Sequence, residues 1–340
     1  VIYFFIPFLL LSVFLIFKSE IWVSCMQKTL SYILLLLVVP NYIMKVYEER
    51  GAEFFKNMML MFSVILLAGL LLKFFGFKTV IFIDRYTGVF GNPNGMGLFG
   101  SIFFLLFCTI LHYFPDLFSR KEKYYIFGVI VISIILCASR NAIMTICIFL
   151  LFTRLYKISP FLGFIIFLMI IVACELIFSS FESIVSNLNL GEYFRLETIK
   201  TGSGRDIAWR FAWDNIQDNF FLGKGFAHDE VVFYGAGNQE ALNLLGHQGN
   251  AHNSFLTLWL ATGLIGLFLF MAGFLLAFLK GANNARIAIP LVYAILFSAT
   301  FESWLVASLN PFTIQIWIIL TLLMTDQFNN KGNEDTLPVH

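Results

Sequence analysis

Charged residues are scarce in this sequence. Only 13% of its 340 residues are Asp, Glu, Lys or Arg, whereas a soluble domain has about 25%. Hydrophobic residues make up 59% of the chain, and 42 residues are phenylalanine. This composition excludes an ordinary soluble domain and indicates a chain embedded in lipid. The formal net charge of +1 also leaves no basic excess to follow a phosphate backbone, so nucleic acid is not expected as a partner.

Cysteine is also rare, and no CxxC motif or Cys/His spacing occurs. The five cysteines lie singly in or near apolar stretches: Cys25, Cys108, Cys137, Cys147 and Cys174. We interpret them as small buried hydrophobic residues, and we expect no disulfide, no metal site and no cofactor. The chain begins inside an apolar stretch without Met or a basic segment, which we interpret as an N-terminal truncation and not as a signal peptide.

Apolar stretches long enough for membrane-spanning helices recur along the chain. We expect about ten spans, at 1–17, 29–44, 58–76, 95–114, 124–139, 141–156, 161–179, 254–279, 286–306 and 311–325. The predicted fold is therefore all-α, a polytopic inner-membrane helical bundle with one large outer loop between spans seven and eight. The expected parts are a first bundle part at 1–179, a periplasmic or extracellular loop at 180–253, a second bundle part at 254–325 and a cytoplasmic tail at 326–340.

The short loops on one side of these spans are richer in lysine and arginine, for example at Arg120, Lys121 and Lys123. Cytoplasmic loops carry this excess, so the opposite side, with the 180–253 loop, is predicted to face outward. Within that loop, a capping-box pattern from Ser203 to Asp206 predicts a helix start that places Arg205 in the first turn. The free N–H groups there and a guanidinium both favour a diphosphate. A salt bridge to Asp206 or Glu197 is the structural alternative, which spacing alone slightly favours.

The helix that follows is expected to be amphipathic. Trp209, Trp213, Ile216 and Phe220 form its predicted apolar stripe, with Arg210 and Asp214 paired on another face. This pattern is typical of a helix lying against the membrane surface or the bundle.

A histidine stands where the polar loop meets the eighth span. His252 is followed by Asn253 and Ser254, either of which can cap the next helix. A histidine at this place is a candidate base near neutral pH, although hydrogen bonding to a loop carbonyl is commoner for a single His. Gly263 and Gly266 lie deeper, where small residues allow helices to pack closely.

Two further arginines attract attention. Arg140 is flanked by apolar stretches on both sides, and an arginine so placed usually faces a cavity in the bundle, although it can also extend to the interface. Arg85 precedes the turn Asn92-Pro93-Asn94-Gly95, which has the chemistry of a helix start.

Taken together, these motifs resemble the bacterial O-antigen ligase/polymerase family of membrane glycosyltransferases. His252 and Asn253, followed after nine residues by Gly263 and Gly266, are similar to the strongest family motif. Arg205, Arg140 and the Asn92–Asn94 turn are similar to three others, in the same order over about residues 80–325. About ten spans instead of the usual twelve or so agrees with truncation.

The resemblance implies metal-independent, inverting sugar transfer at the outer face of the bacterial inner membrane. The implied donor is an undecaprenyl-diphosphate-linked glycan and the acceptor another glycan, with a chain-length regulator protein as a candidate partner. His252, Arg205 and Arg140 take the implied catalytic positions, and Arg85, Asn94, Arg210 and Asn253 the substrate-binding ones.

The resemblance leaves the acceptor open. A polymerase joins one lipid-linked repeat to another, a ligase transfers the glycan to lipid A core, and some relatives glycosylate protein. We favour a polymerase because this type is commonest. A transporter or flippase of lipid-linked sugars is the alternative from another class, but such proteins usually show repeated groups of spans and no single large outer domain.

Overall fold

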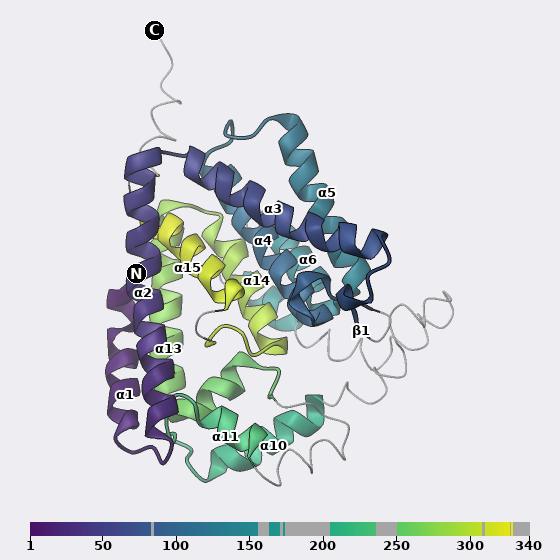
Figure 1. Cartoon of the computed structure of the whole chain (residues 1–340). Helices are drawn as coiled ribbons and strands as arrows, with labels where there is room; N and C mark the ends of the chain where they lie inside the picture. Colours follow the sequence, from purple (N-terminus) through teal and green to yellow (C-terminus); the bar gives the residue numbers. More distant parts are fainter. Residues whose placement is uncertain are drawn as a thin grey trace. The chain divides into compact units, whose positions relative to one another are not determined.

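The computed structural model describes residues 1–82, 85–155, 163–170, 173, 205–235, 250–307, 310–326 and 328. The chain divides into two compact units, each assembled from segments far apart in the sequence. The first unit comprises Val1–Leu37, Ile158–Ala277 and Leu296–Thr313, and the second comprises Val38–Lys157, Phe278–Ile295 and Ile314–His340. Boundaries between the units fall within α2 (Trp22–Arg50), α13 (Ser254–Asn284), α14 (Ala288–Phe301) and α15 (Pro311–Met324), which are labelled in Figure 1.

The first unit contains the N-terminal helices and the described part of the polar loop. Its elements are η1 (Ile2–Phe5), α1 (Ile6–Ile16), the start of α2 (Trp22–Arg50), α10 (Arg205–Gln217), α11 (His228–Tyr234), most of α13 (Ser254–Asn284) and the end of α14 (Ala288–Phe301). In Figure 1, α1 and the start of α2 lie beside α13. Gly273 of α13 lies close against η1, since a Cβ there would collide with the carbonyl oxygen of Phe4.

Aromatic rings form the core of the first unit. Phe8 contacts Tyr32, Phe226 and Phe270 with centroid distances of 6.4, 5.4 and 5.2 Å, in edge-to-face arrangements that aromatic pairs favour. Tyr32 is fully buried and donates a hydrogen bond to the carbonyl oxygen of Leu305 at 3.1 Å. The turn after α14 is thereby tied to α2.

The second unit is centred on α4. Its further elements are the rest of α2, α3 (Glu53–Phe74), η2 (Lys78–Val80), β1 (Ile81–Phe82), β2 (Arg85–Tyr86), η3 (Gly88–Phe90), α4 (Pro93–Tyr113), α5 (Arg120–Cys137), α6 (Arg140–Leu155) and most of α15 (Pro311–Met324). The strands pair antiparallel, with Ile81 opposite Tyr86 and Phe82 opposite Arg85. In the most apolar stretch of α4, 78% of the residues are buried, whereas the figure for α3 is 33%. The difference arises because α4 packs against both α5 and α6.

The expected helices are present where the structure describes them. Four are long and apolar enough to cross a membrane, namely α2, α3, α4 and α13, and the shorter apolar helices span Ile2–Ile16, Ala288–Phe301 and Pro311–Met324. This confirms a mainly helical chain with four candidate membrane-spanning helices, apart from the short strand pair β1–β2, whereas the count of ten spans and the position of the outer loop stay predictions. Of the stretch expected at 161–179, only residues 163–170 and 173 are described.

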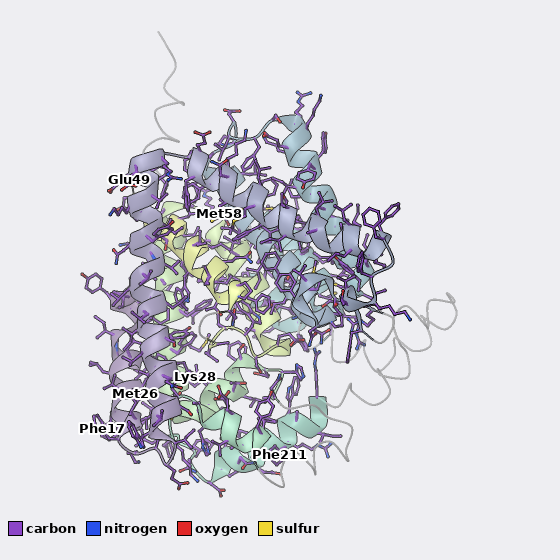
Figure 2. The ribbon with its side chains drawn as sticks, in the orientation of Figure 1. Phe17, Met26, Lys28, Glu49, Met58 and Phe211 are labelled. Carbon is purple, nitrogen blue, oxygen red and sulfur yellow. The ribbon has the colours of Figure 1, made fainter. Side chains whose placement is uncertain are left out.

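Apolar side chains on the outside of these helices suit a lipid surrounding. Leu10, Phe14 and Phe17 of the α1 region are 66, 53 and 85% exposed. Figure 2 shows Phe17 at the edge of the molecule, near the turn between α1 and α2. Lipid removes the cost that water would impose on such side chains.

Candidate functional site

The polar loop and the end of α14 meet at Glu302. The expected span at 286–306 is shorter in the structure, because α14 ends at Phe301 and a turn follows. Ser254 explains this early end: its hydroxyl donates to the carbonyl oxygen of Glu302 at 2.6 Å and accepts from the backbone N–H of Leu305 at 3.2 Å. Hydrogen bonds from the start of α13 thus replace the helical ones and hold Glu302 in a turn.

Asn253 strengthens this junction from the other side. Its backbone N–H donates to the Ser303 hydroxyl at 2.9 Å, and its side-chain oxygen accepts from the N–H groups of Phe255 and Leu256 at 2.9 and 3.0 Å. The last two bonds are an N-cap, which confirms the expected helix start. Asn253 is therefore engaged in structure, and its predicted role in substrate binding stays a prediction.

His252 lies directly before this cap and faces the glutamate. Its Nδ1 is 3.1 Å from Oε2 of Glu302, and its backbone N–H donates to Oδ1 of Asn250 at 2.7 Å. The residue has a φ of 43°, in the left-handed region that side chains other than glycine adopt uncommonly. Such backbone conformations persist where surrounding contacts enforce them, and they are frequent at functional sites.

Arg205 binds the other oxygen of the same carboxylate. Its Nη2 donates to Oε1 of Glu302 at 3.0 Å, and the guanidinium carbon lies 5.8 Å from the centroid of the Phe301 ring. Glu302 is only 12% exposed, whereas Arg205 and His252 are 25 and 23% exposed. The ion pair joins residues 97 apart in sequence. The expected alternative, a salt bridge to Asp206 or Glu197, involves side chains outside the described part of the chain.

The three side chains form an arginine–glutamate–histidine cluster, which has a clear chemical capacity. A carboxylate that accepts from Nδ1–H orients an imidazole and fixes the tautomer in which Nε2 carries the lone pair. The same carboxylate holds a guanidinium close by, and that cation can bind phosphate oxygens in a bidentate manner. The cluster can therefore place a base and an anion-binding group around one substrate.

The glycines of the His252 motif have a backbone role. Gly263 has φ 72° and ψ 178°, and this non-helical conformation kinks α13. The position requires glycine, because a Cβ there would collide with the carbonyl oxygen of Phe221. The chain from Phe220 to Gly225 fills the break. Leu264 N–H donates to Phe220 O at 2.9 Å, and Gly225 N–H donates to Ala261 O at 2.9 Å. Gly263 serves this backbone pairing, and Gly266 makes room for the Thr262 side chain.

The buried face of α10 differs from the expected stripe. Ala208, Ala212 and Ile216 are the buried residues and pack in a core with Val232, Phe233, Ala251 and Leu260. Trp213 is 42% exposed and contacts Trp259 edge-on at 5.4 Å. The expected stripe is thus confirmed at Ile216 and Phe220, which belong to this core or pack against it, whereas Trp213 is exposed and the small Ala208 and Ala212 are buried instead. Arg210 and Asp214 line a shallow surface depression with both tryptophans.

Arg85 and Asn94 come together in the second unit. Arg85 donates through Nη2 to the carbonyl oxygens of Cys137 and Ala138 at 2.8 and 3.3 Å and to Oδ1 of Asn94 at 3.3 Å. These bonds satisfy free carbonyls at the C-terminus of α5, where a cation is favourable. Asn92 caps α4 with Pro93 in its first turn, which confirms the expected helix start.

Arg140 also belongs to the second unit. It is the half-buried first residue of α6, and only Ala138 and Ser139 separate it from α5. The close succession of two helices at this point is as expected. The predicted roles of Arg140, Arg85 and Asn94 toward a substrate stay predictions.

Comparison with known families adds an independent result. The model of a family described as O-antigen ligase matches residues 125–271. The chain therefore carries an O-antigen ligase family domain. The resemblance expected from the motifs is confirmed. No curated protein matches the chain.

The O-antigen ligase match contains five of the seven predicted site residues, while Arg85 and Asn94 precede it. The five are Arg140, Arg205, Arg210, His252 and Asn253. The apolar helices of the chain and the family match together indicate a multi-pass membrane protein with a glycosyltransferase-like activity.

No sequence motif points to Glu302, which binds both Arg205 and His252. The sequence does contain one sign of its importance: Glu302 is an acidic residue inside an expected membrane span, where charged residues usually have a function. Its partner histidine lies 50 positions earlier, so no local spacing connects the two.

Proposed function

We propose that this protein is a surface-polysaccharide polymerase, joining undecaprenyl-diphosphate-linked repeat units at the outer face of the bacterial inner membrane. The observation that carries the proposal is the arginine–glutamate–histidine cluster at the boundary between the polar loop and the apolar helices. Its base and its cation are the two functions that transfer from a lipid diphosphate requires. The O-antigen ligase family match supports the same reaction type.

In the proposed reaction, the acceptor hydroxyl oxygen attacks the anomeric carbon of the donor glycan. His252 accepts the hydroxyl proton at Nε2 while the bond from the anomeric carbon to the diphosphate oxygen breaks. The electron pair of that bond leaves with the diphosphate, whose growing charge Arg205 stabilises. Glu302 keeps the imidazole oriented and stabilises the imidazolium that forms, as the carboxylate does in other histidine-based sites.

Diphosphate is a good leaving group and needs no proton, and arginine can stabilise its charge, so the reaction is proposed to be metal-independent. A single displacement at the anomeric carbon makes the proposed reaction inverting. Arg140 is proposed as a second cation for the diphosphate, and the segment 180–253 as an outer loop that covers the acceptor. The proposed partners are the donor lipid, the acceptor glycan, the bilayer and a chain-length regulator protein.

Ligation of the glycan to lipid A core is the second candidate, because the matched family is described as O-antigen ligase. Deletion of the gene and gel analysis of the surface polysaccharide separates the two. A polymerase is expected to leave one repeat unit on the core and lose the long ladder. Loss of every substituted core with lipid-linked polymer accumulating would indicate a ligase, and an unchanged ladder would contradict both.

A further inference from the structure

The start of α2 has a polar face. Ser24, Gln27, Lys28 and Ser31 follow one another at positions i, i+3, i+4 and i+7, so they lie on one side of the helix. α2 also contains an apolar stretch long enough to cross a membrane. Charged and polar side chains inside such a helix usually face a functional cavity.

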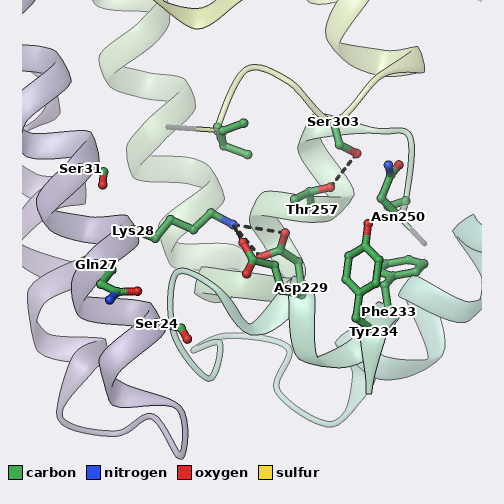
Figure 3. A pocket seen from close by; sticks show the side chains of 14 residues that line it. Ser24, Gln27, Lys28, Ser31, Asp229, Phe233, Tyr234, Asn250, Thr257 and Ser303 are labelled. Carbon is green, nitrogen blue, oxygen red and sulfur yellow. Dashed lines mark hydrogen bonds and ion pairs between the residues drawn. The ribbon is translucent and has the colours of Figure 1, made fainter. Parts of the chain in front are cut away.

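Lys28 is held across this face by α11. Its Nζ donates to both oxygens of Asp229 at 2.9 and 3.3 Å and lies 3.5 Å from Oε1 of Glu230 (Figure 3). Lys28 and Asp229 are 13 and 16% exposed, whereas Glu230 is 58% exposed. Both carboxylates retain acceptor capacity after binding one ammonium group.

A cavity of about 480 Å³ lies between these groups, within the first unit. Its wall includes the polar face of α2, the two carboxylates, Tyr234 and Asn250, and two hydroxyl groups that bond each other, Thr257 and Ser303, at 2.9 Å (Figure 3). Small-molecule sites typically have this volume.

Two residues that line the cavity, Asn250 and Ser303, are close neighbours in sequence of His252 and Glu302 in the arginine–glutamate–histidine cluster. Asn250 accepts from the backbone N–H of His252 at 2.7 Å, and Ser303 follows Glu302 directly. A molecule bound here therefore lies beside the two segments that position the proposed base.

The charges of the cavity restrict its ligand. The described residues that line it include one ammonium group and two carboxylates, so together they carry one net negative charge when all three are ionised. An anion such as phosphate meets a cation already paired with two carboxylates, and is repelled. An uncharged polyol instead donates hydroxyl protons to the carboxylates and accepts from Lys28, Gln27 and the serines, and Tyr234 offers an apolar ring face.

We propose that this cavity binds an uncharged sugar ring, as the subsite for the acceptor saccharide of the glycosyl transfer proposed above. The acceptor role rests on that proposed function, while the binding of a neutral sugar does not. The site discriminates against sugars with a carboxylate at C6.

Saturation-transfer NMR on the purified full chain in lipid nanodiscs, without donor lipid, tests the proposal. The probes are the methyl glycosides of glucose, galactose, mannose and N-acetylglucosamine, with methyl glucuronide and methyl galacturonide as partners that differ only at C6. At least one neutral glycoside is expected to bind, about tenfold more tightly than its uronide.

Two variants locate the binding. Ser31→Leu places an apolar side chain on the polar face, and Tyr234→Ala removes the ring. Each is expected to weaken binding about tenfold. Phe221→Ala is the matched control, an exposed aromatic residue of the same unit outside the cavity, 64% exposed against 56% for Tyr234.

Binding of no neutral glycoside, equal binding of uronides, or equal binding by Ser31→Leu, Tyr234→Ala and wild type would overturn the proposal. Neutral-sugar binding at the cavity in a protein without transfer activity would refute the proposed function and leave the sugar site in place.

Discussion

At the scale of single residues, Glu302 is the side chain on which the site depends. Each of its oxygens binds a different partner, Arg205 through Oε1 and His252 through Oε2. The carboxylate is nearly buried, so removing it would leave a guanidinium without its anion and an imidazole without its orienting acceptor. An arriving diphosphate would compete with Glu302 for the arginine.

We therefore predict that Glu302→Gln separates binding from turnover. Donor-lipid affinity should stay equal or increase, because Arg205 loses a charged competitor. Turnover should fall roughly ten- to a hundredfold, the effect of losing a charged hydrogen bond worth ~1.5–3 kcal/mol. Donor binding and initial rates in nanodiscs measure both quantities. Glu20→Gln, at an exposed position of the same unit, is the control, and loss of donor binding with normal turnover would refute this role.

At the scale of elements, the kink of α13 at Gly263 provides the place where the segment from Phe220 to Gly225 packs. A discontinuous helix leaves free backbone groups, which in lipid must find partners. The segment from Phe220 to Gly225 provides them through bonds to Ala261 and Leu264. The tryptophan–phenylalanine contacts around Trp259 fasten the same segment, since Trp259 Nε1 donates to Phe220 O at 3.0 Å.

Gly263→Ala is predicted to destabilise the protein. The substitution forces alanine into a backbone region with φ 72° and ψ 178° that is essentially restricted to glycine, at a cost of roughly 1–3 kcal/mol. It also drives a methyl group into the Phe221 carbonyl. Gly51→Ala is the matched control, because Gly51 has φ 62° but nothing within 4 Å of a Cβ. Thermal unfolding followed by fluorescence-detected gel filtration should show a larger loss for Gly263→Ala. Equal losses would mean that the collision is relieved without cost.

Most helices are predicted closely from the sequence, because a helix that crosses lipid requires a continuous apolar stretch of about 20 residues. The expected stretch at 95–114 agrees with α4, and the one at 124–139 agrees with α5. The early end of α14 and the kink of α13 were not predictable, because hydrogen bonds from Ser254 and from Phe220 create them over long sequence distances. Glu302 was missed for the same reason.

At the scale of the whole molecule, the apolar helices and the O-antigen ligase match indicate a multi-pass membrane protein with a glycosyltransferase-like activity, and the proposed reaction depends on its orientation. The excess of basic residues around Arg120 and Lys121 predicts that α10 and the cluster face outward. Only that orientation gives access to lipid-linked glycans at the outer face.

A cysteine at Asp218, an exposed position just after α10, is predicted to react with a membrane-impermeant maleimide in intact cells. The background lacks the five native cysteines. A cysteine at Lys121 is the control for the opposite side, and should react only after lysis. The reverse pattern would invert the topology and exclude transfer at the outer face.

The central claim is that His252 acts as a base while Arg205 holds the diphosphate. The most direct measurement is donor-lipid binding and product formation by His252→Asn and Arg205→Ala in nanodiscs. Asparagine is chosen because it tolerates the left-handed backbone at this position. We predict that His252→Asn binds donor lipid like wild type but forms no product, whereas Arg205→Ala binds the donor more weakly. Loss of donor binding in His252→Asn, with binding and turnover intact in Arg205→Ala, would contradict the account.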